Sequence, residues 1–150
     1  MAISGKLVRE VDVKGGGKFI HQIFEHKPNE IAIMSPDKIQ RCDLVSGQWG
    51  ASGSIISLHF IHDGKVNTAK EMMEADDEKI VFKVIEGDVL QVYNALTLTI
   101  HFEEMGDKRL GVWSMDFQKV NASIPDPTTY LDLLCAITKD MDAYILKQAA

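Results

Sequence analysis

The chain of 150 residues has no long apolar run and no excess of basic residues, and these absences exclude several classes of protein. No apolar stretch approaches the roughly 20 residues that a helix needs to cross a bilayer. The N-terminal segment also lacks the apolar core and cleavage site of a secretory signal peptide. The 16 Lys and Arg residues are scattered singly among 22 Asp and Glu, for a net charge of −6. We therefore expect no membrane insertion and no nucleic-acid partner, because anionic membrane surfaces and phosphate backbones both attract clustered basic side chains.

Cysteine is scarce, and the histidines do not compensate for it as metal ligands. Cys42 and Cys135 are far apart and match no metal-binding or redox spacing, so we expect two partly buried free thiols in a reducing compartment. His59 and His62 are three apart in an expected strand and therefore point to opposite faces. The sequence thus predicts a cytoplasmic protein with no metal and no cofactor.

Glycine is concentrated in two runs, at 14–18 and 46–54. Neither run is a phosphate-binding loop, because both lack the Gly-Lys-Ser/Thr sequence and the second precedes a strand instead of a helix. The first run predicts a flexible corner between a strand and a helix. The second predicts a mobile turn or, alternatively, a backbone nest that contacts a ligand or guards an entrance.

Apolar and polar residues alternate along most of the chain, which is typical of half-buried strands. Asp63-Gly64 is the sharpest hairpin signal, because both residues tolerate positive φ. Two short helices are expected between the first two strands, at about 19–28 and 29–34. The predicted strands span 3–13, 39–45, 55–62, 66–75, 80–86, 96–102 and 111–119.

The strongest helical signal comes last, at 128–147, after a segment closed by prolines. Asp126 is the expected N-cap and Pro127 the expected first helical residue. The helix has an apolar face and a polar face. The apolar face carries Tyr130, Leu134, Ile137, Met141 and Ile145, and the polar face carries Asp132, Lys139 and Asp142. The pattern predicts one α+β domain over 1–150, in which an antiparallel sheet grips the helix and leaves a hollow.

Several polar residues are expected on the inner face of this sheet. Alternation places Arg9 with Leu7 and Val11, Glu86 with the apolar residues of its strand, and His62 beside Phe60. A charge on a sealed apolar face costs several kcal/mol unless it is paired. These groups either orient a ligand in a cavity or are solvent-exposed at strand ends without a function, and the sequence leaves both alternatives open.

Six stretches resemble the plant major latex protein family, within the birch-pollen-allergen superfamily of pathogenesis-related class-ten proteins. They cover the chain in order and make the resemblance specific. They are Gly5-Lys6-Leu7, Ser35-Pro36-Asp37-Lys38-Ile39-Gln40, GASGSII from Gly50, His62-Asp63-Gly64-Lys65 with Ala69-Lys70-Glu71, FKVIEGD from Phe82, and IPDPTTYL from Ile124 with Thr138-Lys139-Asp140.

The resemblance implies the helix-grip fold, in which a seven-stranded curved antiparallel sheet, two short helices and a long C-terminal helix enclose a large apolar cavity. It also implies intracellular binding of a hydrophobic small molecule, such as a hormone, terpenoid, flavonoid or lipid-like compound, in plant defence or specialised metabolism. The alternative is a cofactor-independent cyclase or isomerase acting on a reactive iridoid or alkaloid intermediate. A third option is a ligand-dependent protein interaction.

On this interpretation the ligand contacts apolar side chains, and a few polar groups orient it or act as catalytic candidates. The catalytic candidates are Glu86, His62, Arg9 and Tyr93. Arg9, Leu58 and the triple glycine at 15–17 depart from the family pattern. We expect a monomer with a ligand site lined by Arg9, Leu58, Phe60, Phe82, Val84, Leu98, Ile100, Trp113, Met115, Phe117, Tyr130, Leu134, Ile137 and Met141.

Overall fold

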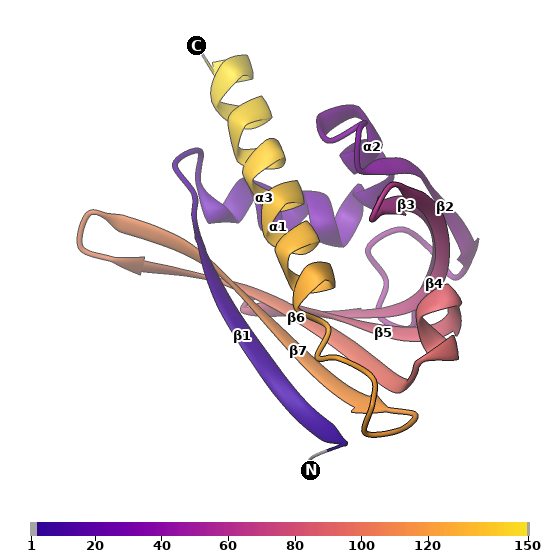
Figure 1. The fold of residues 1–150 in the computed structure, drawn as a ribbon. Helices are drawn as coiled ribbons and strands as arrows, with labels where there is room; N and C mark the ends of the chain where they lie inside the picture. The colour runs from indigo at the N-terminus through magenta and orange to yellow at the C-terminus, as the bar shows by residue number, and fades with distance from the viewer. Residues whose placement is uncertain (1–2, 150) are drawn as a thin grey trace.

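A computed structural model describes residues 3–149 and shows a seven-stranded antiparallel sheet that curves around one long helix (Figure 1). The strands follow the order β1-β7-β6-β5-β4-β3-β2, so every neighbouring pair except β1–β7 is consecutive in the chain. The predicted α+β architecture is confirmed. The strands are β1 (Ser4–Asp12), β2 (Ile39–Ser46), β3 (Ser54–His62), β4 (Lys65–Ala75), β5 (Lys79–Gly87), β6 (Tyr93–Met105) and β7 (Lys108–Lys119).

The helices lie against one side of this sheet. α1 packs on β5, β6 and the long helix α3, while α2 packs on β2 and α3. A short 3₁₀ turn, η2, follows β5. The bounds are α1 (Gly17–His26), η1 (Pro28–Glu30), α2 (Ile31–Met34), η2 (Asp88–Gln91) and α3 (Thr128–Ala149).

The hairpin of β6 and β7 is longer than the sequence predicts. Its ladder runs to Met105 paired with Lys108, and its tip projects beyond the rest of the sheet in Figure 1. The charged residues near the tip are exposed, so they carry no apolar alternation from which a strand could be predicted.

The long helix begins at the predicted residue, although Pro127, expected as its first helical residue, lies just before it. Its first residue is Thr128, and the Pro127 carbonyl accepts the backbone N–H of Leu131 at 3.2 Å. The Asp126 carboxylate, predicted as the N-cap, forms an ion pair with Lys119, with Nζ 2.7 Å from its Oδ1. Asp126 therefore joins the segment before α3 to the end of β7.

Two polar contacts fasten the middle of α3 to the rest of the molecule. The buried Trp113 indole N–H donates to Thr138 Oγ1 at 2.8 Å, and the Thr138 hydroxyl donates to a backbone carbonyl one turn back in the helix. Asp140 accepts hydrogen bonds from Ser35 Oγ at 2.6 Å and Lys38 Nζ at 2.7 Å. These contacts join β7 and the turn after α2 to α3.

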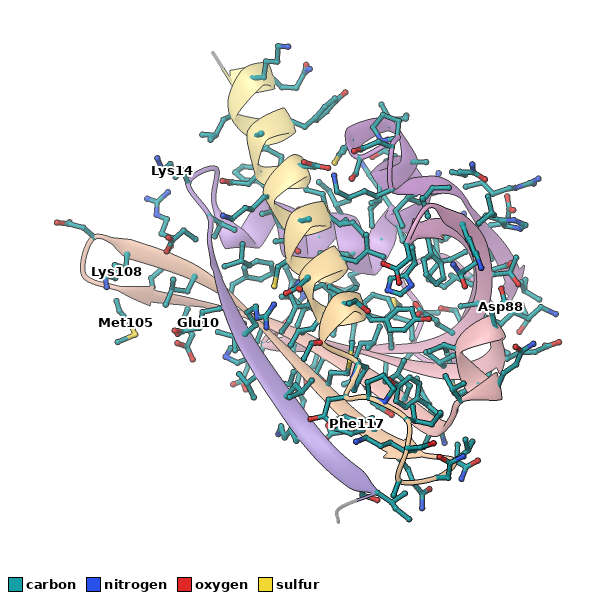
Figure 2. The ribbon with its side chains drawn as sticks, viewed as in Figure 1. Glu10, Lys14, Asp88, Met105, Lys108 and Phe117 are labelled. Carbon is teal, nitrogen blue, oxygen red and sulfur yellow. The ribbon has the colours of Figure 1, made fainter. Side chains whose placement is uncertain are left out.

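A third contact fixes the glycine-rich corner between β1 and α1. The Asp142 carboxylate accepts the backbone N–H of Lys14, at 2.9 and 2.8 Å from its two oxygens, and that of Gly15. Figure 2 shows Lys14 at this corner, beside the C-terminal half of α3. Asp142 is buried, which corrects its predicted place on the polar face. The corner predicted to be flexible is held by a charge-assisted contact.

Replacing Asp142 with Ala should lower the free energy of unfolding by about 2–3 kcal/mol, because two partly buried backbone donors lose a charged acceptor. Asp132→Ala on the same helix is the matched control. Asp132 is exposed and pairs with Arg9, so its loss should change stability by less than about 1 kcal/mol. Urea denaturation measures both values. Equal losses in the two variants would contradict this role of Asp142.

Candidate functional site

An apolar cavity lies between the sheet and the N-terminal half of α3. It has a volume of about 100 Å³. β3, β4, β5, β6 and β7 supply its floor, α3 covers it, and α1 and the following turns close its side. Its walls are Phe24, Pro28, Ile31, Ile39, Ile56, Leu58, Phe60, Ala69, Glu71, Phe82, Val84, Val89, Leu96, Leu98, Trp113, Met115, Tyr130, Leu133, Leu134 and Ile137.

Most of the residues predicted to line a ligand site lie on this cavity. Strand alternation places the inward-facing residues of four strands there, and helical spacing places the apolar stripe of α3 above them. The predicted residues on the wall are Leu58, Phe60, Phe82, Val84, Leu98, Trp113, Met115, Tyr130, Leu134 and Ile137.

Four predicted residues are not on the cavity wall. Ile100 and Met141 are fully buried in the core. Phe117 packs edge-on against Tyr93 at the far end of β7, where Figure 2 labels it. Arg9 pairs in register with Trp113 and so lies on the face that alternation predicts. However, β1 is the edge of the sheet, so the Arg9 side chain is exposed and forms an ion pair with Asp132.

Glu86 also lies outside the cavity, because a β-bulge reverses its direction. Val84 pairs with Glu71, but Glu86 pairs with Lys70, so Ile85 is an extra residue in β5. The bulge turns Glu86 outward, where its carboxylate lies 3.3 Å from Lys70 Nζ. The predicted inward position of Glu86 is therefore wrong.

His62 and Tyr93 support the helix without reaching the wall. The His62 ring stacks on Tyr130, with centroids 3.9 Å apart, and its Nε2 lies 2.8 Å from Thr129 Oγ1. The Tyr93 hydroxyl donates to the Pro125 carbonyl at 2.6 Å. Both residues thus position the start of α3, and His62 touches the cavity only through Tyr130.

Within residues 3–149, Glu71 alone brings a carboxyl group to the cavity wall, and it is not among the predicted site residues. Glu71 faces inward from the middle of β4, between Ala69 and Met73 along its strand, and pairs with Ile56 on β3 and Val84 on β5. Its side chain is only 7% exposed. The hairpin at Asp63-Gly64 carries the signal that could have found it, since counting pairs back from this turn places Glu71 opposite Ile56.

Burial changes the chemistry of Glu71. Desolvation raises the pKa of its carboxyl group from 4.5 to about 7, because an apolar environment disfavours the charged form. Nearby on β2, burial raises the pKa of the Cys42 thiol to about 12, with the Glu71 charge adding to the effect. The cavity therefore carries a carboxyl group able to gain or lose a proton near neutral pH, beside a thiol that stays protonated.

The cavity is apolar as predicted, but it is not large. Small-molecule pockets typically have volumes of about 300–1,000 Å³, against about 100 Å³ here. A dry cavity of about 150 Å³ holds one benzene-sized molecule. The cavity is thus somewhat smaller than one that holds a benzene-sized molecule, and binding a ligand of that size or larger requires its walls to move.

A second, polar depression of about 1000 Å³ lies between α1 and the β6–β7 hairpin and is lined by His21, His26 and His101, among others. His21 lies 3.3 Å from Glu25, and His101 lies 2.9 Å from Glu103. Across residues 3–149, no group of three or more His, Cys, Asp or Glu side chains is arranged to hold a metal ion. Nor does any helix in that range combine the length and apolar character needed to span a bilayer.

Glu71 should make stability depend on pH in an unusual direction. The folded-state pKa of about 7 lies above the ordinary 4.5, so the folded state binds the proton more tightly. The contribution of this group to stability is full below about pH 4.5 and is lost as pH rises through about 7, by on the order of 3 kcal/mol. Glu71→Gln should remove this loss, giving a variant more stable than the wild type at pH 8.

Denaturation in urea at several pH values measures this difference. Glu74→Gln is the matched control, because Glu74 is exposed on the same strand. Parallel pH profiles for the wild type and Glu71→Gln would show that the Glu71 carboxyl is not desolvated.

Known proteins match this chain over nearly its full length. The model of the pathogenesis-related protein Bet v 1 family matches residues 2–148. MLP-like protein 43 of Arabidopsis thaliana is 34% identical over 98% of this chain and 96% of its own length. Some relatives are longer: the chain spans 45% of the length of MLP-like protein 28 of the same plant.

The solved structures agree with the sequence matches. Major latex-like protein 151 of Panax ginseng superposes with a TM-score of 0.93 at 34% identity, over 97% of this chain and 99% of that one. Norcoclaurine synthase from Thalictrum flavum shares the fold at 18% identity, with a TM-score of 0.72 over 97% and 88% of the two chains. These likenesses confirm the helix-grip fold. The chain therefore belongs to the pathogenesis-related protein Bet v 1 family and, within it, to the major latex-like proteins.

Proposed function

We propose that this protein binds a hydrophobic small molecule in the cavity beneath α3. The observation that carries the proposal is an apolar cavity inside a folded chain, whose walls come from six strands and five helical segments. Protein interiors are normally packed without voids larger than a water molecule, and apolar cavities bind apolar molecules. A hormone, terpenoid, flavonoid or lipid-like compound has the required character.

Apolar contact supplies most of the binding free energy in such a site. Burial contributes roughly 25 cal/mol per Å² of apolar surface, before the entropic cost of association. The flexible side chain of Met115 lies on the wall and lets it adapt to ligands of different shape. Met34 and Met141 lie elsewhere in the core.

Acid–base catalysis is the second candidate function, and the Glu71 carboxyl favours it. A general acid or base works best when its pKa lies near the operating pH, and burial brings Glu71 into that range. In an isomerase or cyclase, Glu71 would move a proton on a substrate enclosed by apolar walls. Cytoplasmic location and a monomeric state stay predictions for either function.

Native mass spectrometry of the protein incubated with a plant metabolite extract tests these functions. A binder should retain an apolar metabolite unchanged. An enzyme should consume a compound and release an isomer or a ring-closed product, and Glu71→Gln should abolish that turnover. Failure to retain or convert any metabolite would contradict both functions.

Filling the cavity should abolish ligand retention. Ala69 is buried on the cavity wall, so Ala69→Leu places three more carbon atoms inside it. We expect at least about ten-fold weaker binding of the retained ligand, equivalent to about 1.4 kcal/mol. Titration calorimetry measures the affinity. Ala143→Leu, the same substitution at an exposed position of α3, is the matched control, and equal affinity in both variants would place the ligand elsewhere.

A further inference from the structure

Among the residues that the structure describes, the Glu71 carboxyl is the one charged group on an otherwise apolar wall. No Lys, Arg or His side chain between residues 3 and 149 lines the cavity. The hydrogen bonds and ion pairs found across residues 3–149 include none to the Glu71 side chain, although this residue is 7% exposed. Buried carboxylates in proteins are normally paired or hydrogen-bonded. No protein group donates to Glu71, yet its oxygens are not sealed from solvent, since no fully buried side-chain oxygen in residues 3–149 lacks a partner. The donor therefore comes from water or from a bound molecule that replaces it.

The chemistry of the wall selects the kind of donor. A basic nitrogen carries a positive charge and N–H groups, so it satisfies the carboxylate by both charge and hydrogen bonding. An anionic group placed beside Glu71 would meet a like charge or force the carboxyl to stay protonated. The surrounding side chains offer only apolar contact to the rest of the ligand, apart from the Tyr130 hydroxyl.

We propose that the cavity binds small apolar molecules that carry a basic nitrogen, with this nitrogen held against the Glu71 carboxylate. The inference rests on the proposed binding function and names its ligand class. It requires the ammonium to lie on the β4 side of the cavity, while the hydrocarbon part contacts β3, β5 and α3.

Binding of such a ligand is coupled to the ionisation of Glu71, and few other groups complicate the coupling. β3, β5, β6, β7 and α1 present apolar side chains to the cavity. Cys42 from β2 and Tyr130 from α3 have pKa values raised by burial, so both stay neutral near pH 7. His62 contacts Tyr130 at the margin, which makes a Glu71 variant necessary to assign the pH dependence.

Benzylamine and ethylbenzene form a matched probe pair, because an ammonium group in one replaces a methyl group in the other. Titration calorimetry measures both affinities at about pH 8 for the wild type, Glu71→Gln and the control Glu74→Gln. The ratio of benzylamine to ethylbenzene affinity should fall at least ten-fold in Glu71→Gln and stay unchanged in Glu74→Gln. Ethylbenzene affinity should not decrease in Glu71→Gln.

The wild type alone provides a second measurement that needs no variant. Benzylamine affinity should rise about ten-fold from about pH 6 to about pH 8, as a carboxyl of pKa about 7 ionises. Ethylbenzene affinity should not rise over the same range. Benzylamine affinity that does not change with pH would overturn the inference, and so would an affinity ratio that Glu71→Gln leaves unchanged. In either case, binding of ethylbenzene would still support the cavity as a ligand site. Binding of neither probe would overturn both.

Discussion

The division of α3 into two halves is the constraint on which the rest of the structure depends. Thr138, Asp140 and Asp142 fasten its second half to β7, to the turn after α2 and to the β1–α1 corner. The side chains that cover the cavity come from its first half, up to Ile137. Because polar contacts are directional, they fix the height and rotation of the helix above the sheet. The apolar half can then span a hollow that it does not have to fill.

This arrangement explains how a carboxyl group persists inside the domain. On a sealed face, Glu71 would meet close-packed apolar atoms, and its ionised form would be strongly disfavoured. In the hollow it keeps the freedom to exchange a proton, at a pKa of about 7. The anchors on α3 that hold the helix in place therefore shape the site, although Thr138, Asp140 and Asp142 do not lie on its wall.

The fold and most of the cavity wall could be predicted from the sequence, because strand alternation and the helical stripe reflect burial directly. The exceptions have physical causes. The bulge at Ile85 reverses Glu86, and a single extra residue leaves no mark in an alternating pattern. Arg9 lies on the predicted face, but only the strand order reveals that β1 is an edge. Helical spacing places Asp142 on the polar side of α3, but the β1–α1 corner, whose N–H groups bind its carboxylate, covers it.

Glu71 differs from these cases, since the register of one hairpin was enough to place it opposite Ile56. Glu86 follows the apolar residues of its strand and is therefore predicted to face inward. Glu71 instead lies between Ala69 and Met73, two apolar residues on the inner face of β4. An apolar side chain at this position would avoid a penalty on the order of 3 kcal/mol at alkaline pH. Folding therefore gives no reason for a carboxyl group there. Residues that reduce stability in this way are characteristic of binding and catalytic sites, where the unmet interaction is completed by the ligand.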